Sequence, residues 1–103
     1  MINANDAARM VVEYRKEIER KRKEEVDAIF PEIMAVINDE VISAANVGQG
    51  NCRISLKRLS GFTDFIRLEY LKEKVEVQLT QILGYRVVSL NYDSINIIWF
   101  TDV

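Results

Sequence analysis

The spacing of apolar residues changes along this chain, and that change restricts the fold more than any other feature of the sequence. Near the N-terminus, Ala7, Val11, Tyr14 and Ile18 recur at steps of four and three, which is the period of one face of an α-helix. Around Cys52, apolar and polar residues alternate instead, as they do in a strand with one buried face. The combination predicts a fold of the α+β class, with helices packed on a sheet.

The first half of the chain is predicted to be helical. Residues 5–30 predict a long charged helix, for which Asn3 or Asn5 is a suitable N-cap. Pro31 is the only proline, and because it lacks a backbone N–H group, we expect either two helices or one bent helix here. Residues 31–46 are strongly apolar, so we expect them to be buried on more than one side.

The middle of the long helix carries only charged residues. From Glu19 to Glu25 no apolar side chain is available for burial, so we expect this segment to be solvated. Glu17 with Lys21, and Glu19 with Lys23, have the spacing of ion pairs along a helix. Because acidic residues flank the basic run on both sides, a salt-bridged surface is favoured over nucleic-acid binding.

The second half of the chain predicts three strands and one more helix. Thr63 or Asp64 is a suitable cap for that helix, and Gly84 ends it. The expected strands are residues 52–57, 85–90 and 95–100, of which the last two form a hairpin. The expected architecture is a single domain, 1–103, in the order α-α-β-α-β-β. Two or three helices would pack on one face of a small, mainly antiparallel sheet.

The last strand is expected to be apolar on both faces. Ile95, Ile97 and Trp99 would point to one side, and Ile98 and Phe100 to the other. A sheet that is covered on one side only has a polar second face, so a second cover is implied. We expect this cover to be another copy of the chain in a homo-oligomer, or else one of the first two helices.

Composition argues against an enzyme. The chain of 103 residues has no histidine and one cysteine, Cys52, which excludes the usual nucleophile–histidine pairs and removes the commonest zinc ligand. We therefore expect a non-enzymatic protein without metal or cofactor, in which Cys52 is a small buried residue. The formal charge of −2 disfavours a nucleic-acid polymer as partner. The absence of a long apolar run and of a signal-peptide pattern predicts a cytoplasmic protein with no membrane role.

Four basic residues form the candidate binding site. Arg53 and Lys57 would share the outward face of the first strand, Arg58 would follow at its end, and Arg86 would lie on the hairpin. Together they would make a basic strip that holds the phosphate or carboxylate groups of a small anionic ligand. The alternative is a solvated sheet face, since edge strands often carry Lys and Arg that block edge pairing.

Several stretches resemble parts of small bacteriophage-encoded α+β proteins. They are Asp6-Ala7-Ala8-Arg9 in the first helix, Ala44-Ala45 before a glycine, Gly84-Tyr85-Arg86-Val87, and Ile97-Ile98-Trp99. The resemblance spans most of the chain and implies no catalytic residue. With this resemblance, one hypothesis is a phage accessory protein in the host cytoplasm. The expected assembly and the basic strip around Arg53 motivate a homo-oligomeric binding module that sequesters a nucleotide-type defence signal (counter-defence). The alternative is a virion or assembly protein that acts through its long helix.

Overall fold

A single helix accounts for the first 46 residues of the chain. The computed structural model describes residues 1–101, and in it α1 (Ala4–Asn46) runs without interruption for 43 residues. Of the two expected caps, Asn3 is the one used, because its side chain accepts a hydrogen bond of 2.8 Å from the N–H group of Asp6. At the other end Gly48 has φ 83°, a left-handed conformation that glycine adopts without strain and that ends the helix.

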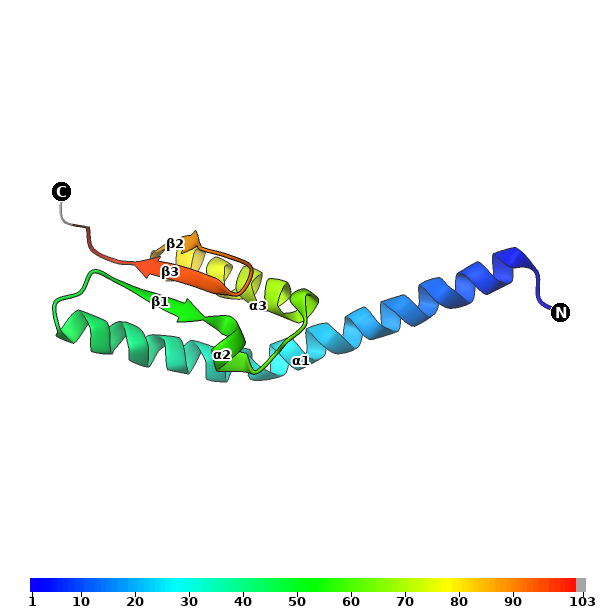
Figure 1. Ribbon diagram of the computed structural model, residues 1–103, viewed down its shortest axis with the longest axis horizontal. Helices are drawn as coiled ribbons and strands as arrows, with labels where there is room; N and C mark the ends of the chain where they lie inside the picture. Colours follow the sequence, from blue (N-terminus) through cyan, green and yellow to red (C-terminus); the bar gives the residue numbers. More distant parts are fainter. Residues whose placement is uncertain (102–103) are drawn as a thin grey trace.

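Pro31 bends α1 but does not end it. Of the two outcomes expected from the sequence, the structure has one bent helix, whose axis changes direction near its middle (Figure 1). Proline removes the hydrogen bond to the carbonyl group four residues earlier, that of Asp27. Both residues are exposed, so water is available to that carbonyl group and the broken bond costs less than it would in the core.

The sheet has three antiparallel strands in the spatial order β1-β3-β2. They are β1 (Asn51–Ser55), β2 (Arg86–Ser89) and β3 (Ser94–Ile98), so the predicted hairpin and the α+β fold class are confirmed. Gly50 ties the end of β3 to the start of β1, since its carbonyl group accepts bonds from the N–H groups of Trp99 and Phe100. A Cβ atom at Gly50 would lie 2.1 Å from the carbonyl oxygen of Phe100, so only glycine fits there.

The first strand is shorter than expected. It ends at Ser55, and residues predicted as its last two positions begin the short helix α2 (Leu56–Ser60). The hydroxyl oxygen of Ser55 accepts a bond of 3.3 Å from the N–H group of Arg58 and so caps this turn. Leu56 is fully buried in either arrangement, and therefore the alternating pattern did not distinguish them.

The second long helical segment begins and ends where the sequence predicts. Asp64 caps α3 (Phe65–Val77), which continues as the π-helical turn η1 (Gln78–Ile82). Gly84 follows with φ 77° and leads into β2. Leu68, Leu71, Val75 and Leu79 form one buried stripe along this segment.

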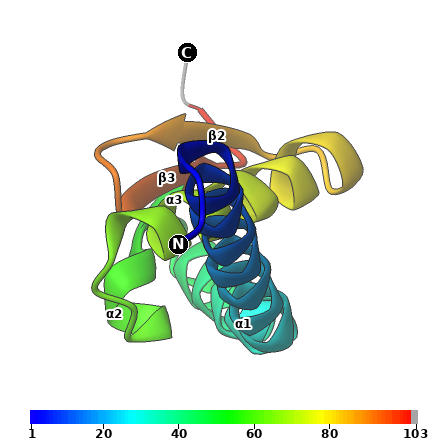
Figure 2. The same ribbon diagram turned by 90° about the vertical axis from the view of Figure 1, so that its right-hand side faces the viewer.

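The core lies between the sheet and the helices α1 and α3. It is built from Val26, Ile33, Ile37 and Val41 of α1, Ile54 of β1, Ile95 and Ile97 of β3, Leu56 of α2, and the stripe of α3 and η1. Figure 2 shows the sheet on one side of these helices, and its opposite face carries no helix within residues 1–101. The expectation that a helix covers the second face is therefore wrong.

The open face of the sheet is mainly polar. It presents Arg53 and Ser55 of β1, Arg86 of β2, and Ser94 and Asn96 of β3. Its apolar members are Val88 and the half-buried Ile98, because Phe100 lies beyond the end of β3. This face accordingly gives little physical reason for a second copy of the chain to cover it.

Candidate functional site

The expected basic strip is only partly assembled, around one pocket of about 350 Å³. The pocket lies beside β1, where the end of that strand, α2, the β2–β3 connection and one residue of α1 meet. Its walls are formed by Glu40, Arg53, Ile54, Ser55, Arg58, Leu59, Leu90, Asn91 and Ser94. Two of the four predicted site residues, Arg53 and Arg58, are therefore brought together at one cavity.

Arg53 and Arg58 reach this pocket from different elements. Arg53 lies in the middle of β1, in register with Asn96, and its side chain is exposed on the open face of the sheet. Arg58 is placed by the turn of α2 that Ser55 caps. Within residues 1–101 neither guanidinium group has a carboxylate within ion-pair distance, so both are available to an anion from solution.

The other two predicted residues lie outside the pocket. Lys57 was expected on the outward face of a strand, but it belongs to α2, where the chain has already left the sheet. Arg86 is on the open face but pairs with Ile98 on β2. Because β3 separates β2 from β1, Arg86 is two strands away from Arg53.

The sequence pattern missed four polar residues of the pocket. Glu40 comes from α1, Ser55 from the end of β1, Asn91 from the β2–β3 connection and Ser94 from the start of β3. No local signal identifies Glu40, because its position depends on how α1 packs beside β1. The carboxylate of Glu40 offsets part of the positive charge of Arg53 and Arg58, so the pocket attracts anions less strongly than the two arginines alone would.

Cys52 has no features of a reactive thiol. It is half-buried and packs against the core. Burial, and secondarily the negative charge of Glu40, raises the pKa of its thiol, which lowers the fraction of nucleophilic thiolate. These properties match the small apolar role expected from the sequence.

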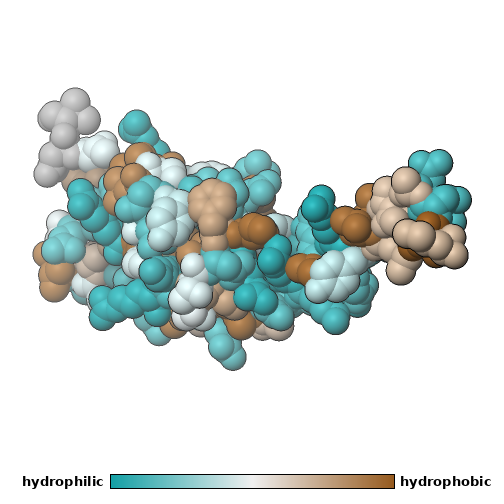
Figure 3. Space-filling model, turned by 45° about the vertical axis from the view of Figure 1, so that its right-hand side comes forward, coloured by the Kyte–Doolittle hydropathy of each residue, from teal (hydrophilic) through white to brown (hydrophobic). Residues whose placement is uncertain are grey.

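Several large apolar side chains are exposed along the N-terminal part of α1. We call residues 4–18 the arm, because this segment projects from the rest of the fold (Figure 1). Tyr14 is 68% exposed, Met10 61%, Val12 49% and Val11 48%. Figure 3 shows hydrophobic groups along the projecting segment. The molecule measures 68 × 25 × 23 Å, and its radius of gyration of 18.0 Å exceeds the value of about 13 Å typical of a compact chain of this size.

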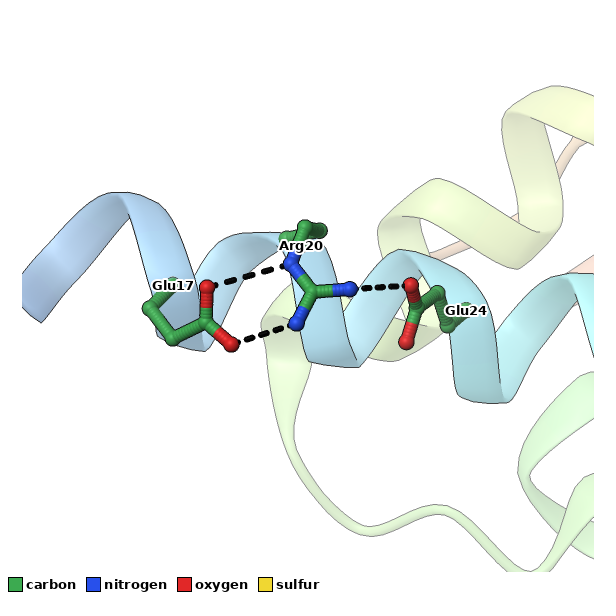
Figure 4. Close-up of polar contacts among 3 residues, drawn as sticks. All are labelled: Glu17, Arg20 and Glu24. Atoms are coloured by element: carbon green, nitrogen blue, oxygen red, sulfur yellow. Dashed lines mark hydrogen bonds and ion pairs between the residues drawn. The ribbon is translucent and has the colours of Figure 1, made fainter.

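Beyond the arm, α1 is held by ion pairs along its own surface. The guanidinium group of Arg20 bonds to the carboxylates of Glu17 and Glu24 (Figure 4), and Lys23 lies 3.3 Å from Glu19. The predicted Glu19–Lys23 pair is thus present, whereas Glu17 pairs with Arg20 instead of Lys21. The hydrogen bond from Arg20 holds the pKa of the Glu17 carboxyl below its ordinary value.

A second set of ion pairs joins α3 to the part of α1 that follows the arm, at Glu25 and Asp27. Arg67 lies 2.6 Å from Glu25 of α1 and 3.2 Å from its own helix cap, Asp64. Burial opposes ionisation of Asp64, but the hydrogen bonds and positive charge of Arg67 outweigh burial and hold the pKa of this carboxyl below its ordinary value. Lys74 also pairs with Asp27. These contacts fix the direction in which the arm leaves the fold.

Residues 1–101 hold no metal-ligand cluster and no membrane-spanning helix that would add a further candidate site. Among the described residues, no three His, Cys, Asp or Glu side chains gather as a metal site requires. No helix within residues 1–101 combines the length and the apolar character needed to cross a bilayer. No protein-family model, curated protein or solved structure matches this chain.

Proposed function

We propose that this chain is a non-enzymatic assembly protein that uses its arm to join other protein chains, first of all copies of itself. The observation that carries the proposal is the arm: Met10, Val11, Val12 and Tyr14 are exposed to solvent on a segment of α1 that projects from the rest of the fold. Large exposed apolar surfaces of this kind are typical of interaction sites.

Energetics also favour a partner for the arm. A helix of 15 residues without tertiary contacts is marginally stable in water, and apolar side chains on its surface add nothing to its stability. Burial of a valine or isoleucine side chain contributes about 1.5–3 kcal/mol, so covering these side chains would stabilise the arm substantially. In keeping with the resemblance to phage proteins, we propose a role in a virion or in its assembly.

Hydrogen exchange of the arm amides tests this function. We expect the N–H groups of residues 8–18 to exchange slowly at concentrations where the chain is assembled, because a packed helix opens rarely. On dilution they should exchange rapidly, while the amides of α3 keep their rates. Fast arm exchange at every concentration would contradict the proposal.

The pocket supports a second candidate function, binding of a small anion. Arg53 and Arg58 line one cavity without an internal ion-pair partner among residues 1–101, and the cavity is of the size that a small ligand occupies. Under this proposal the protein sequesters a nucleotide-type defence signal in the host cytoplasm, as a phage counter-defence protein would. Lys57 and Arg86 have no direct part in it.

Replacement of Arg53 tests the pocket. Arg53→Ala should weaken binding of a nucleotide by about 1.5–3 kcal/mol, the contribution of a hydrogen bond to a charged group. Arg86→Ala is the matched control, because Arg86 is an exposed arginine on the same sheet face but outside the pocket. A thermal-shift screen of mono- and cyclic nucleotides provides the ligand. Equal affinities of the two variants, or no stabilising nucleotide, would reject this function.

A further inference from the structure

The arm carries the seven-residue pattern of a coiled coil. If Val11 is placed at position a of a heptad, the a and d positions from the first helical residue onward are Ala4, Ala7, Val11, Tyr14 and Ile18. None of these five residues is charged. The flanking positions differ in charge: the e positions hold Ala8, Arg15 and Arg22, and the g positions hold Met10, Glu17 and Glu24.

We infer that the arm forms a parallel, in-register, two-stranded coiled coil with the arm of a second copy of this chain. This inference rests on the proposed function, and it adds the partner, the contact face and the polarity. Val11 and Ile18, the large residues at the a positions, are β-branched, as in parallel two-stranded coiled coils, although the d positions hold Ala7 and Tyr14 where those coiled coils have leucine.

Charge complementarity selects the parallel orientation. In a parallel pair, a g residue faces the e residue five positions later on the partner. This brings Glu17, which also accepts bonds from Arg20 of its own chain, opposite the second copy's Arg22 on both sides of the seam. An antiparallel pair instead brings g opposite g and e opposite e. Two antiparallel registers pair the apolar residues of the arms. In the first, Ile18 packs against Tyr14 of the second copy, and the two copies of Glu17 face each other, as do the two copies of Arg15. In the second antiparallel register, Val11 packs against Tyr14 of the second copy, and no ion pair forms between the e and g residues.

The rest of the fold leaves this seam free. At 100° per residue, the buried residues Val26, Ile33 and Ile37 lie about 70–110° around the helix axis from the middle of the a and d positions between Ala7 and Ile18. The a and d positions beyond the arm are all exposed at Lys21, Glu25, Ala28, Glu32 and Ala35. The domain of each chain therefore covers a different side of α1 from the one that carries the seam.

The charges at the base of the arm set the end of the contact. Lys21 at d and Glu25 at a place like charges opposite each other in a parallel pair, and Glu25 already pairs with Arg67 of its own chain. The coiled coil accordingly spans residues 4–18, about 22 Å of helix. A seam of two heptads predicts a reversible dimer, in which both domains and both pockets lie at the same end.

A disulfide trap tests the polarity. Ala7→Cys at position d is combined with Cys52→Ala, which removes the native thiol. Lys16→Cys in the same background is the matched control, since position f faces away from the seam. In the parallel pair, the two copies of residue 7 face each other. In the antiparallel registers they are about 16 Å or about 27 Å apart along the axis, well beyond the separation of less than 7 Å between Cα atoms that a disulfide requires.

Under mild oxidation we expect Ala7→Cys to form a covalent dimer at least about tenfold faster than Lys16→Cys. A mixture of the Ala7→Cys and Ile18→Cys proteins separates the parallel pair from the antiparallel pair with Val11 against Tyr14, in which residue 7 faces residue 18. With Ile18 against Tyr14, residue 7 faces residue 25 instead, so a dimer that forms no 7–7 disulfide also overturns the inference. If the mixed 7–18 disulfide forms in preference to both symmetric ones, the pair is antiparallel; the inference is then overturned while the proposed function stands. If Ala7→Cys and Lys16→Cys cross-linked at the same rate, the disulfides would come from random collisions, and the inference would be overturned. A chain that is monomeric and forms no disulfide at any of the three positions would reject both.

Discussion

Leu79→Ala is expected to lower the free energy of unfolding by about 2–5 kcal/mol, because it leaves a cavity where the sheet meets the end of the second helical segment. Leu79 is 2% exposed and belongs to the buried stripe of this segment. The main-chain carbonyl group of Leu79 also accepts a hydrogen bond of 2.9 Å from the N–H group of Tyr85 at the turn into β2. Urea denaturation followed by circular dichroism measures the loss.

Ile82→Ala is the control for this change. Ile82 lies in the same turn, η1, but is 67% exposed, so its truncation should alter the free energy of unfolding by less than about 0.5 kcal/mol. If the two variants lost the same stability, the end of this helix would not pack against the sheet as described.

Val11→Lys is expected to weaken self-association by roughly 100-fold or more. The change removes one valine from the seam in each chain, and each loses burial worth about 1.5–3 kcal/mol. It also places two ammonium groups opposite each other in an apolar layer. Val12→Lys is the matched control, since Val12 is the next residue, has the same side chain and is equally exposed in the single chain, but occupies position b outside the seam. Neither change should lower the stability of the domain, because the arm is outside the core.

The parts of the fold that were predicted correctly depend on local chemistry. Asn3 and Asp64 cap helices through their own side chains, and Gly48 and Gly84 end helical segments through conformations available within a few residues. The three strands follow from alternation of apolar residues and from a turn composition between the last two. Such signals lie within one stretch of sequence and need no knowledge of distant contacts.

The continuity of α1 through Pro31 depends on tertiary structure and was left open for that reason. Whether a proline ends a helix depends on what its missing hydrogen bond costs, and that cost depends on exposure of the carbonyl group of Asp27. The first strand was predicted too long because Leu56 is buried both at the end of a strand and at the start of α2. Over so few residues, the strand period and the helix period predict the same buried position.

The candidate sites needed the arrangement of elements in space. Arg53 and Arg58 line one pocket, whereas Lys57, which lies between them in sequence, belongs to α2 and is outside it. Arg86 is separated from Arg53 by a central strand whose position no local pattern specifies. Glu40 enters the pocket only through the packing of α1 beside β1. The apolar stripe of the arm was recognised as a helical face, but its freedom from the core became visible only in the fold.

Light scattering on a sizing column measures directly whether the arm joins two chains. The series compares the unmodified protein, Val11→Lys and Val12→Lys over the same range of concentrations. The unmodified protein and Val12→Lys should approach twice the chain mass of 11.9 kDa as concentration rises, while Val11→Lys should remain at the mass of one chain. An unmodified protein that stays at 11.9 kDa throughout, or a Val11→Lys variant that associates as strongly as Val12→Lys, would contradict assembly through the arm.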